Sequence, residues 1–436
     1  MNPTSKDRTE ILVHGDPTPL RSVVLCKWQP VLARELMERA LVHVVLDNFD
    51  VEHADIDQDL LSRASSVHVV STFNALEELA TVAVSIRLQD PEVGRVISFT
   101  EFSQLGGSYL AEVLGLGAQV PGSVATRDKR WMKHVLAEAG VPTPQFSSLP
   151  DHTDSAAVAA MAERLEFPVV VKPAAGFGTM STHLAHNRAE FAETLRSFTY
   201  EPTLGSRQLI VESFVEAEEL YVDAYWGNGG PHFYFVSRYF APRLTVLRGG
   251  PQQDGGELLF REEHQELYEE LESLTAQVMS ALGISETMIH LEVFRRPDGK
   301  IVFSEIATRV GGGWSPGLMS QAMGRSVWTA IAELAITGRT ERPRPVAPHI
   351  GVLHLRPHAP GRIVEIPTIE EIEATPGVLG AQVWHEKGDV LQMHHASEWV
   401  AFAFIGAETA DELDRLFKLI PQRLPVRTAP IEALSR

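Results

Sequence analysis

A chain of 436 residues is long enough for several domains with their own cores, and its net charge of −19 argues against a broad nucleic-acid-binding surface. Cys26 is the only cysteine, which excludes an intrachain disulfide or a thiolate metal cluster and fits a reducing compartment. The first ten residues lack an apolar signal core, and no run of 18 apolar residues occurs. We therefore expect a cytoplasmic protein without a nucleic-acid or membrane partner.

Short apolar runs alternate with helical patterns in the first hundred residues. The expected strands are Ser22–Cys26, Leu41–Leu46, Ser66–Val70 and Arg95–Phe99. Helices are expected after the first strand and near Asn74–Arg87, so the alternation predicts an α/β fold that begins with a small parallel sheet. Glu101 follows the last strand, where open parallel sheets place ligand groups, although a solvated loop acid fits equally well.

A dinucleotide-binding domain is the obvious rival for such a sheet, but the glycine motif that it needs is missing. No G-x-G-x-x-G follows the first strand, and Gly115-Leu116-Gly117 has Val120 where the third glycine should stand. No G-x-x-x-x-G-K-[ST] occurs either. Both common phosphate-loop motifs are therefore excluded.

A helix and a glycine loop follow a small-residue break near residues 121–125. Arg127–Pro144 has apolar residues at helical spacing, and Gly140 and Pro142 end the pattern. Lys129 lies in the first turn, where a cation opposes the helix dipole, so either an anionic partner or solvent must satisfy it.

The stretch FPVVVKPAAGFGTMST, Phe167–Thr182, reads as a buried strand that ends in Lys172 and leads into a loop with Gly176 and Gly178. An ammonium beside unhindered backbone amides is a plausible phosphate cradle. A buried lysine stem beside an ordinary glycine turn fits equally well, because short glycine loops are weak signals.

An acid-rich segment comes next, after a helix near Arg188–Phe198 and a strand at Gln208–Phe214. Val215–Trp226 alternates as a strand with one polar face. The acids of this region are Glu212, Glu216, Glu218, Glu219 and Asp223. A charge run is usually solvated surface, but the position between two apolar strands weakens that interpretation.

Met288–Gly313 predicts a hairpin whose turn is Pro297-Asp298-Gly299. Counting from this turn places Glu292 and Glu305 near one another on neighbouring strands. Two carboxylates in an apolar setting repel, and a divalent cation is the usual remedy. Arg309 and three glycines, Gly311–Gly313, follow, so the group together predicts a phosphate and magnesium site.

The last part, from about Pro345, contains short strands and an amphipathic helix at Thr409–Ile420. His354 and His358 share one segment, but without a third ligand they are weak as a metal site.

In their order along the chain, the lysine and glycine loop, the acid-rich strand and the paired glutamates resemble the ATP-grasp superfamily. Within it the chain looks most like carboxylate–amine ligases such as the bacterial L-amino acid ligases. The resemblance implies an α+β ATP-grasp fold in four parts. These are a Rossmann-like N-terminal domain (1–122), a small subdomain with the lid (123–210), a large subdomain (211–342) and a C-terminal α+β domain (343–436).

The resemblance also implies roles for individual residues. For ATP, Lys129 and Lys172 look like the phosphate-binding lysines, with Gly176, Gly178 and Thr179 in the lid. Glu212, Ser213, Phe214 and Val215 resemble the hinge that receives adenine, and Glu219 looks like the acid that binds the ribose. Glu292 and Glu305 match the acids that bind Mg²⁺, or Mn²⁺ in its place. Arg309 matches the arginine that steadies phosphate and carboxylate, with Glu101, Gly312 and Gly313 beside the substrate.

The expected reaction joins a small-molecule carboxylate and an amine through an acyl phosphate, with release of ADP and phosphate. A homodimer is expected because it is common in this superfamily. A phosphotransferase or a nucleotide-gated regulatory protein of the same fold stays an alternative, whereas a biotin-dependent carboxylase has no specific mark. One departure is Ala307, where the family commonly has a metal-binding asparagine; an alanine cannot coordinate.

Overall fold

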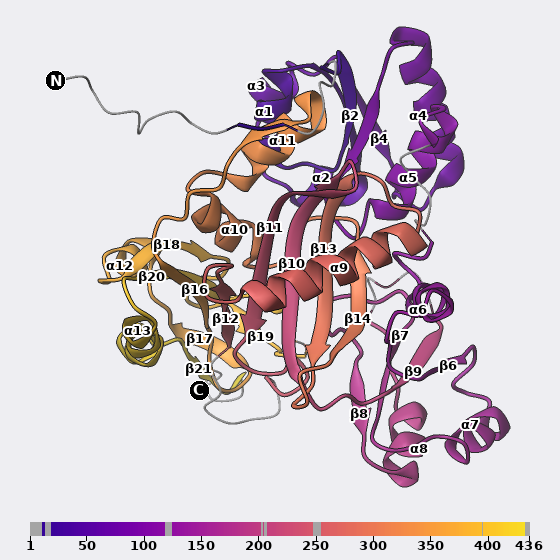
Figure 1. The fold of residues 1–436 in the computed structure, drawn as a ribbon, viewed down its shortest axis with the longest axis vertical. Helices are drawn as coiled ribbons and strands as arrows, with labels where there is room; N and C mark the ends of the chain where they lie inside the picture. The colour runs from indigo at the N-terminus through magenta and orange to yellow at the C-terminus, as the bar shows by residue number, and fades with distance from the viewer. Residues whose placement is uncertain are drawn as a thin grey trace.

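The computed structural model describes residues 11–13, 19–117, 124–201, 204, 207–246, 254–394 and 396–431. Residue 120 and the expected boundary between residues 122 and 123 lie outside these ranges. Figure 1 shows the N-terminal sheet at the top, a large central sheet, a smaller sheet at the lower right and the C-terminal part on the left.

The N-terminal sheet is parallel, as the alternation of strands and helices predicted. Its order is β4-β3-β2-β5, and the strands are β2 (Ser22–Cys26), β3 (Leu41–Asp47), β4 (Ser66–Val70) and β5 (Arg95–Ser98). Its helices are α1 (Pro30–Met37), α2 (Asn48–His53), α3 (Gln58–Leu61), α4 (Leu76–Gln89) and α5 (Gln104–Val113). The central strand β2 is buried on both faces, which explains its unbroken apolar run.

A smaller antiparallel sheet carries the glycine loop. Its order is β6-β9-β7-β8, with β6 (Phe146–Leu149), β7 (Val169–Pro173), β8 (His183–Ala185) and β9 (Leu209–Ser213). The helices of this region are α6 (Lys129–Glu138), α7 (Ser155–Ala162) and α8 (Arg188–Arg196). Asp128 caps α6 by accepting from the Arg130 N–H, so Lys129 becomes the first helical residue.

The central sheet has eight strands in the order β14-β13-β10-β11-β12-β16-β20-β18. The strands are β10 (Glu218–Gly227), β11 (Gly230–Tyr239), β12 (Gly255–Leu259), β13 (Thr287–Arg295), β14 (Ile301–Ala307), β16 (His349–Leu355), β18 (Val378–Val383) and β20 (Ala401–Ala407). Helix α9 (Gln265–Ala281) lies across one face of β10 and β13 (Figure 1). The sheet is continuous across residues 342 and 343, so the last part of the chain extends it by three strands.

The remaining elements lie outside the three sheets described so far. They are β1 (Ile11–Val13), which pairs with β15 (Arg339–Glu341), the helices α10 (Ser315–Met323), α11 (Val327–Thr337), α12 (Ile369–Glu373) and α13 (Ala410–Arg423), and a sheet of β17 (Gly361–Glu365), β19 (Val390–Leu391) and β21 (Arg427–Ala429). Helix α13 buries the apolar stripe that its sequence predicted, against β16 and β20.

The acid-rich strand differs from the expected alternation with one polar face. In β10 the residues from Leu220 to Gly227 are buried, and Asp223 is only 2% exposed. Asp223 lies opposite His290 on β13, and the two side chains are 2.8 Å apart. Pairing between strands satisfies the carboxylate in the interior, which period-two alternation alone does not reveal.

Asp254 joins the central strands to the C-terminal ones. It is 4% exposed and accepts from Arg243, from His354 Nδ1 at 2.8 Å and from Arg356 at 3.1 Å. Burial would raise the pKa of Asp254, but Arg243 and His354 outweigh it and hold that pKa well below its usual value.

We expect Asp254→Asn to lower the free energy of unfolding at pH 7 by about 3–5 kcal/mol, because it leaves buried cations without their counter-ion. The loss should shrink at acid pH, because a carboxylate with a depressed pKa stabilises above its unfolded pKa and ceases to do so as the pH falls. Urea unfolding at pH 7 and pH 3 measures both effects. Asp389→Asn, at a half-exposed carboxylate paired with His385, is the matched control; an equal loss in both variants would contradict the role of Asp254.

Candidate active site

A cavity of about 180 Å³ lies between the smaller sheet and the central sheet. Most of the residues that the sequence singled out line it: Lys129, Lys172, Gly176, Gly178, Thr179, Glu212, Ser213, Phe214, Val215, Glu219, Glu292, Glu305, Arg309 and Gly312. Glu101 and Gly313 are not part of its wall; Glu101 lies behind Arg309, and Gly313 lies against Trp399. Segments from position 129 to position 399 thus meet at one site.

Two lysines enter the cavity from the smaller-sheet side. Lys172 stands near the end of β7, and its Nζ lies 3.0 Å from Glu212 Oε2. Lys129 begins α6; its Nζ donates to the Gly176 carbonyl at 2.5 Å and lies 3.2 Å from Glu305 Oε2. Burial would lower the pKa of Lys172, but Glu212 and Glu305 raise it, so this lysine stays charged. Two buried cations of this kind suit phosphate oxygens.

Glu212 is held by two lysines, Lys172 and Lys133, and the sequence analysis singled out only the first of these lysines. Its other neighbour is Lys133 on α6, whose Nζ is 3.5 Å from Glu212 Oε1 and donates to the Ser304 carbonyl. Burial lowers the pKa of Lys133 to about 8, with Glu212 acting against the fall. The helical pattern of α6 places Lys133 one turn after Lys129. Its partners lie on β9 and β14, far along the chain, so sequence alone did not reveal them. The Glu212 side chain is thus structural, which leaves the backbone of this segment for a ligand.

The glycine loop is folded over the cavity. Gly178 has φ +59° and Thr179 has φ +61°, both in the left-handed region, whereas Gly176 does not need this conformation. A Cβ at Gly176 would lie 3.1 Å from the ring of Pro173, so here the constraint is space. The two glycines therefore serve different purposes in one loop.

Glu219, on β10, faces the hinge end of the cavity. Its Oε2 accepts from the Arg243 backbone N–H at 3.0 Å. Burial raises the pKa of Glu219 to about 7; Arg243 and Lys172 act against the rise, and the charge of Glu292 adds to it. In the hinge, the N–H groups of Ser213 and Phe214 already donate to the carbonyls of Gln145 and Pro168.

Glu292 and Glu305 lie directly opposite each other on β13 and β14, as counting from the turn predicted. The Pro297-Asp298-Gly299 turn forms, with the Arg296 N–H bonded to the Lys300 carbonyl at 3.0 Å. The ladder shifts between Glu292 and Val293, a bulge at the position of the first acid. Both carboxylates therefore reach the same cavity.

The expectation that these two acids repel each other without relief is wrong. Burial alone would raise the pKa of Glu305, but Lys129 and Lys172 outweigh it and lower that pKa to about 2. On the other side, His290 Nε2 lies 3.5 Å from Glu292 Oε1. Burial would lower the pKa of His290, but Asp223 and Glu292 raise it to about 9, so the imidazole is cationic at neutral pH. Side-chain cations thus balance the pair.

His290 lies opposite Ala307 in the pairing of β13 and β14. Position 307 is the one at which the ATP-grasp superfamily commonly has an asparagine. Asp223 and Glu292 lie beside the two ring nitrogens of His290 and favour the charged imidazole, in which both nitrogens donate. Nothing in the sequence marked His290, since its role depends on pairing with β10.

Arg309 is fixed by contacts with the N-terminal part of the chain. Its Nε donates to Glu101, which also accepts from Arg127, and its Nη1 donates to the Val310 carbonyl at 2.7 Å. Burial lowers the pKa of Arg309, and the surrounding acids act against the fall. Glu101 is thus placed to orient Arg309, and Arg127 was not apparent from sequence.

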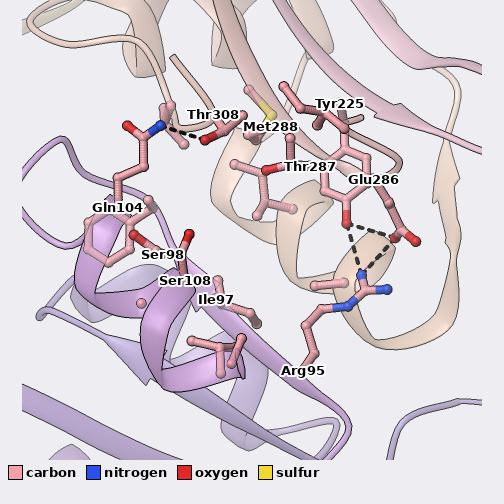
Figure 2. A pocket seen from close by; sticks show the side chains of 18 of the residues that line it. Arg95, Ile97, Ser98, Gln104, Ser108, Tyr225, Glu286, Thr287, Met288 and Thr308 are labelled. Carbon is pink, nitrogen blue, oxygen red and sulfur yellow. Dashed lines mark hydrogen bonds and ion pairs between the residues drawn. The ribbon is translucent and has the colours of Figure 1, made fainter. Parts of the chain in front are cut away.

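A second cavity of about 290 Å³ lies behind this cluster, between β5 and α5 on one side and residues 284–288 and 308–310 on the other. Figure 2 shows Gln104 reaching Thr308, and Arg95 pointing to Tyr225 and Glu286. Gln104 also bonds Thr126 at 2.7 Å. Since Thr126 and Thr308 directly precede Arg127 and Arg309, these bonds fix the backbone next to both arginines.

The chain was compared with known proteins. A family model described as an ATP-grasp domain matches residues 165–316. An L-arginine-specific L-amino acid ligase of Bacillus subtilis is 27% identical over 370 residues, which are 82% of this chain and 86% of the relative. Dapdiamide A synthase of Enterobacter agglomerans is 24% identical over 280 residues, 62% of this chain and 64% of that protein. The structure of an L-amino acid ligase from Bacillus licheniformis superposes with a TM-score of 0.73 at 19% identity, covering 95% and 100% of the two chains.

Residues 165–316 thus match an ATP-grasp domain, and the α+β ATP-grasp fold that the sequence predicted is confirmed. The amino acid ligase of Bacillus subtilis matches this protein over most of both chains. None of the described helices has the length and apolar character needed to cross a lipid bilayer. No group of three or more acids, histidines or cysteines able to hold a metal by itself occurs among the described residues.

We expect Glu305→Gln to lower stability at pH 7, in the absence of nucleotide and metal, by on the order of 1–3 kcal/mol. A carboxylate with a depressed pKa stabilises the fold above its unfolded pKa and loses that contribution as the pH falls, so the difference should shrink toward pH 3. Catalytic activity should fall by orders of magnitude. Thermal melting across this pH range and turnover check both. A variant that melts at or above the parent temperature at pH 7 would show that Lys129 and Lys172 do not depend on this charge.

Glu219→Gln should have the opposite effect on stability. A carboxyl group whose pKa is raised by folding stabilises the fold fully below its unfolded pKa and loses that contribution as the pH rises through 7. At pH 8.5 the parent protein is therefore destabilised by ionised Glu219, whereas the glutamine variant is not. The free energy of unfolding of the variant, relative to that of the parent, should therefore be higher at pH 8.5 than at pH 5.5. Its KM for ATP should rise about tenfold. In the parent, KM for ATP should rise as the pH falls below 7. Glu218→Gln, next in sequence but paired with Arg238, is the control and should change neither.

Proposed function

We propose that the protein is an ATP-dependent carboxylate–amine ligase that joins an amino acid or other carboxylate to an amine and releases ADP and phosphate. The observation that carries the proposal is the convergence of Lys129, Lys172, Glu292, Glu305 and Arg309 on one cavity. Cations for phosphate, acids for a metal and a guanidinium for the reacting group are the set that acyl-phosphate chemistry needs.

ATP would lie with its adenine against the hinge. Val170, Phe214 and Phe294 give that part of the cavity apolar walls. Because the N–H groups of Ser213 and Phe214 are already bonded, the N–H of Val215 is the donor that this proposal assigns to adenine. Glu219 would accept from the ribose hydroxyls, and Lys129 and Lys172 would bind phosphates under the lid.

Glu292 and Glu305 fit Mg²⁺, with Mn²⁺ as a substitute, in donor chemistry. Two carboxylates on facing strands supply hard oxygen ligands, and phosphate oxygens and water would complete the coordination. The bound cation would neutralise charge on the transferring phosphate. With alanine at position 307, the protein ligands are these two acids, so the metal would depend on the nucleotide for the rest.

A carboxylate is a poor electrophile at neutral pH, so it must gain a leaving group before an amine can attack. Its oxygen attacks the γ-phosphorus, ADP leaves, and the amine then displaces phosphate from the acyl phosphate. With Nε and Nη1 of Arg309 occupied, its Nη2 is the nitrogen assigned to the reacting oxygens. Gly178 and Thr179 close the site and keep water from the acyl phosphate.

Two alternatives share these residues. A phosphotransferase would stop at a phosphorylated product, and a regulatory binding protein would have no use for both acids together with Arg309. The named relatives, which include an amino acid ligase and a dapdiamide synthase, favour ligation of small molecules.

The test is phosphate release from ATP and Mg²⁺ with a panel of amino acids, singly and in pairs, with L-arginine in the first set because of the B. subtilis relative. We expect ADP, not AMP, and a release that needs two substrates, with a new amide seen by mass spectrometry. The Glu305→Gln variant is the inactive control. Stoichiometric AMP would contradict the acyl phosphate, and a phosphorylated product that accumulates without amine would favour the phosphotransferase.

A further inference from the structure

The C-terminal part of the chain reaches into the active site through four residues, Ala396–Trp399, which we name the latch segment. It lies between β19 and β20, and its Ser397 and Trp399 line the cavity. The family model ends at residue 316, so this contribution comes from outside the ATP-grasp domain itself.

The latch segment is bonded to the lid. Ser397 Oγ donates to the Gly178 carbonyl at 2.9 Å, and the Ala396 N–H points to Thr179 Oγ1 at 3.4 Å. The fit is tight, because a Cβ at Gly178 would lie 2.6 Å from Ser397 Oγ. Arg243 anchors the segment from the central sheet by donating to the Ala396 carbonyl at 3.3 Å.

Trp399 forms part of the cavity wall. Its indole lies on the glycine loop after Arg309, where a Cβ at Gly313 would be 2.7 Å from Trp399 Cζ2. Trp314 supports it at a ring-centroid distance of 5.5 Å, and Phe402 at 5.3 Å. The indole thus occupies space that any side chain at position 313 would need. Its position is set by the ring of Phe402 on β20 and by the ring of Trp314 just before α10.

The lid has a second contact on its other side. Phe177 packs edge-to-face on Phe102, with ring centroids 5.1 Å apart. Phe102 directly follows Glu101, which orients Arg309. The three lid residues Phe177–Thr179 therefore touch the N-terminal part and the C-terminal part of the chain at once.

We propose that Trp399 is a specificity-determining residue that limits the size of the carboxylate substrate, and that the Ser397–Gly178 bond ties this wall to the closed lid. The proposal rests on the ligase function proposed above. A carboxylate held at Arg309 has its side chain beside the indole, which favours small and apolar side chains that fit against an aromatic face. When the lid opens, the latch segment loses its hydrogen bond to the Gly178 carbonyl, and Trp399 keeps only the support of Arg243 and the neighbouring rings.

The experiment measures acyl-phosphate formation without the amine, by trapping with hydroxylamine in the presence of ATP and Mg²⁺. The acids are glycine, L-alanine, L-leucine, L-phenylalanine and L-tryptophan. For Trp399→Ala we expect kcat/KM for the two aromatic acids to rise at least tenfold relative to L-alanine, with KM for ATP unchanged. Trp399→Phe should lie between the two. An equal change for all five acids would show that Trp399 only supports the fold and would overturn its role.

The matched control is Trp384→Ala. Trp384 packs on the same Phe402 ring, with centroids 4.5 Å apart, but is 46% exposed and does not line the cavity. It should leave the order of preference among acids unchanged. A change of preference like that of Trp399→Ala would attribute the effect to the packing of Phe402 and contradict the proposal.

Ser397→Ala tests the lid contact separately. Hydrogen exchange of residues 176–182, with a non-hydrolysable ATP analogue and Mg²⁺ bound, should be at least threefold faster in the variant, and more ATP should be hydrolysed per hydroxamate formed. Unchanged exchange would overturn the latch. If the parent forms hydroxamate with none of the acids, the proposed ligase function fails, while the exchange measurement, which needs no turnover, still decides the latch.

Discussion

The site depends on the burial of lysine charges beside carboxylates. Lys133 is fully buried, and the side chains of Lys129 and Lys172 are 8% and 13% exposed. Water therefore solvates none of these three ammonium groups fully. Removing a charge from water costs several kcal/mol unless a partner compensates. Glu212 compensates Lys172 and Lys133, and Glu305 compensates Lys129. The position of each of these lysines is therefore set by a carboxylate on a strand of the smaller or the central sheet.

This balance explains how the two sheets are held around the cavity. Glu212 belongs to the smaller sheet, Glu305 belongs to the central sheet, and Lys129 on α6 lies between them. An incoming nucleotide would supply phosphates to the lysines, and Glu305 would then be free to bind a cation. Each charged group would exchange one partner for another, so no unpaired charge would be buried. Charges that already point where a transferring phosphate will lie need little rearrangement during the reaction.

Sequence reasoning succeeded where the signal was local. Strand alternation predicted the parallel sheet, and the Pro297-Asp298-Gly299 turn set the register that places Glu292 opposite Glu305, because a hairpin is a short-range structure. It failed where the partner lies far along the chain. His290 depends on Asp223, 67 residues away, and that separation has no periodic trace in sequence.

The part of the chain after residue 342, which the family resemblance implied to be a C-terminal domain, continues the central sheet. Strand β16 pairs with β12. Strand pairing across that point makes the last part of the chain a structural extension of the catalytic core. The position of its latch segment follows from this pairing, because β16 and β20 carry His354 and Phe402, whose rings pack on Trp399. A ligase that must hold an acyl phosphate away from water benefits from such a wall, since the same residues that exclude solvent also set which carboxylate fits.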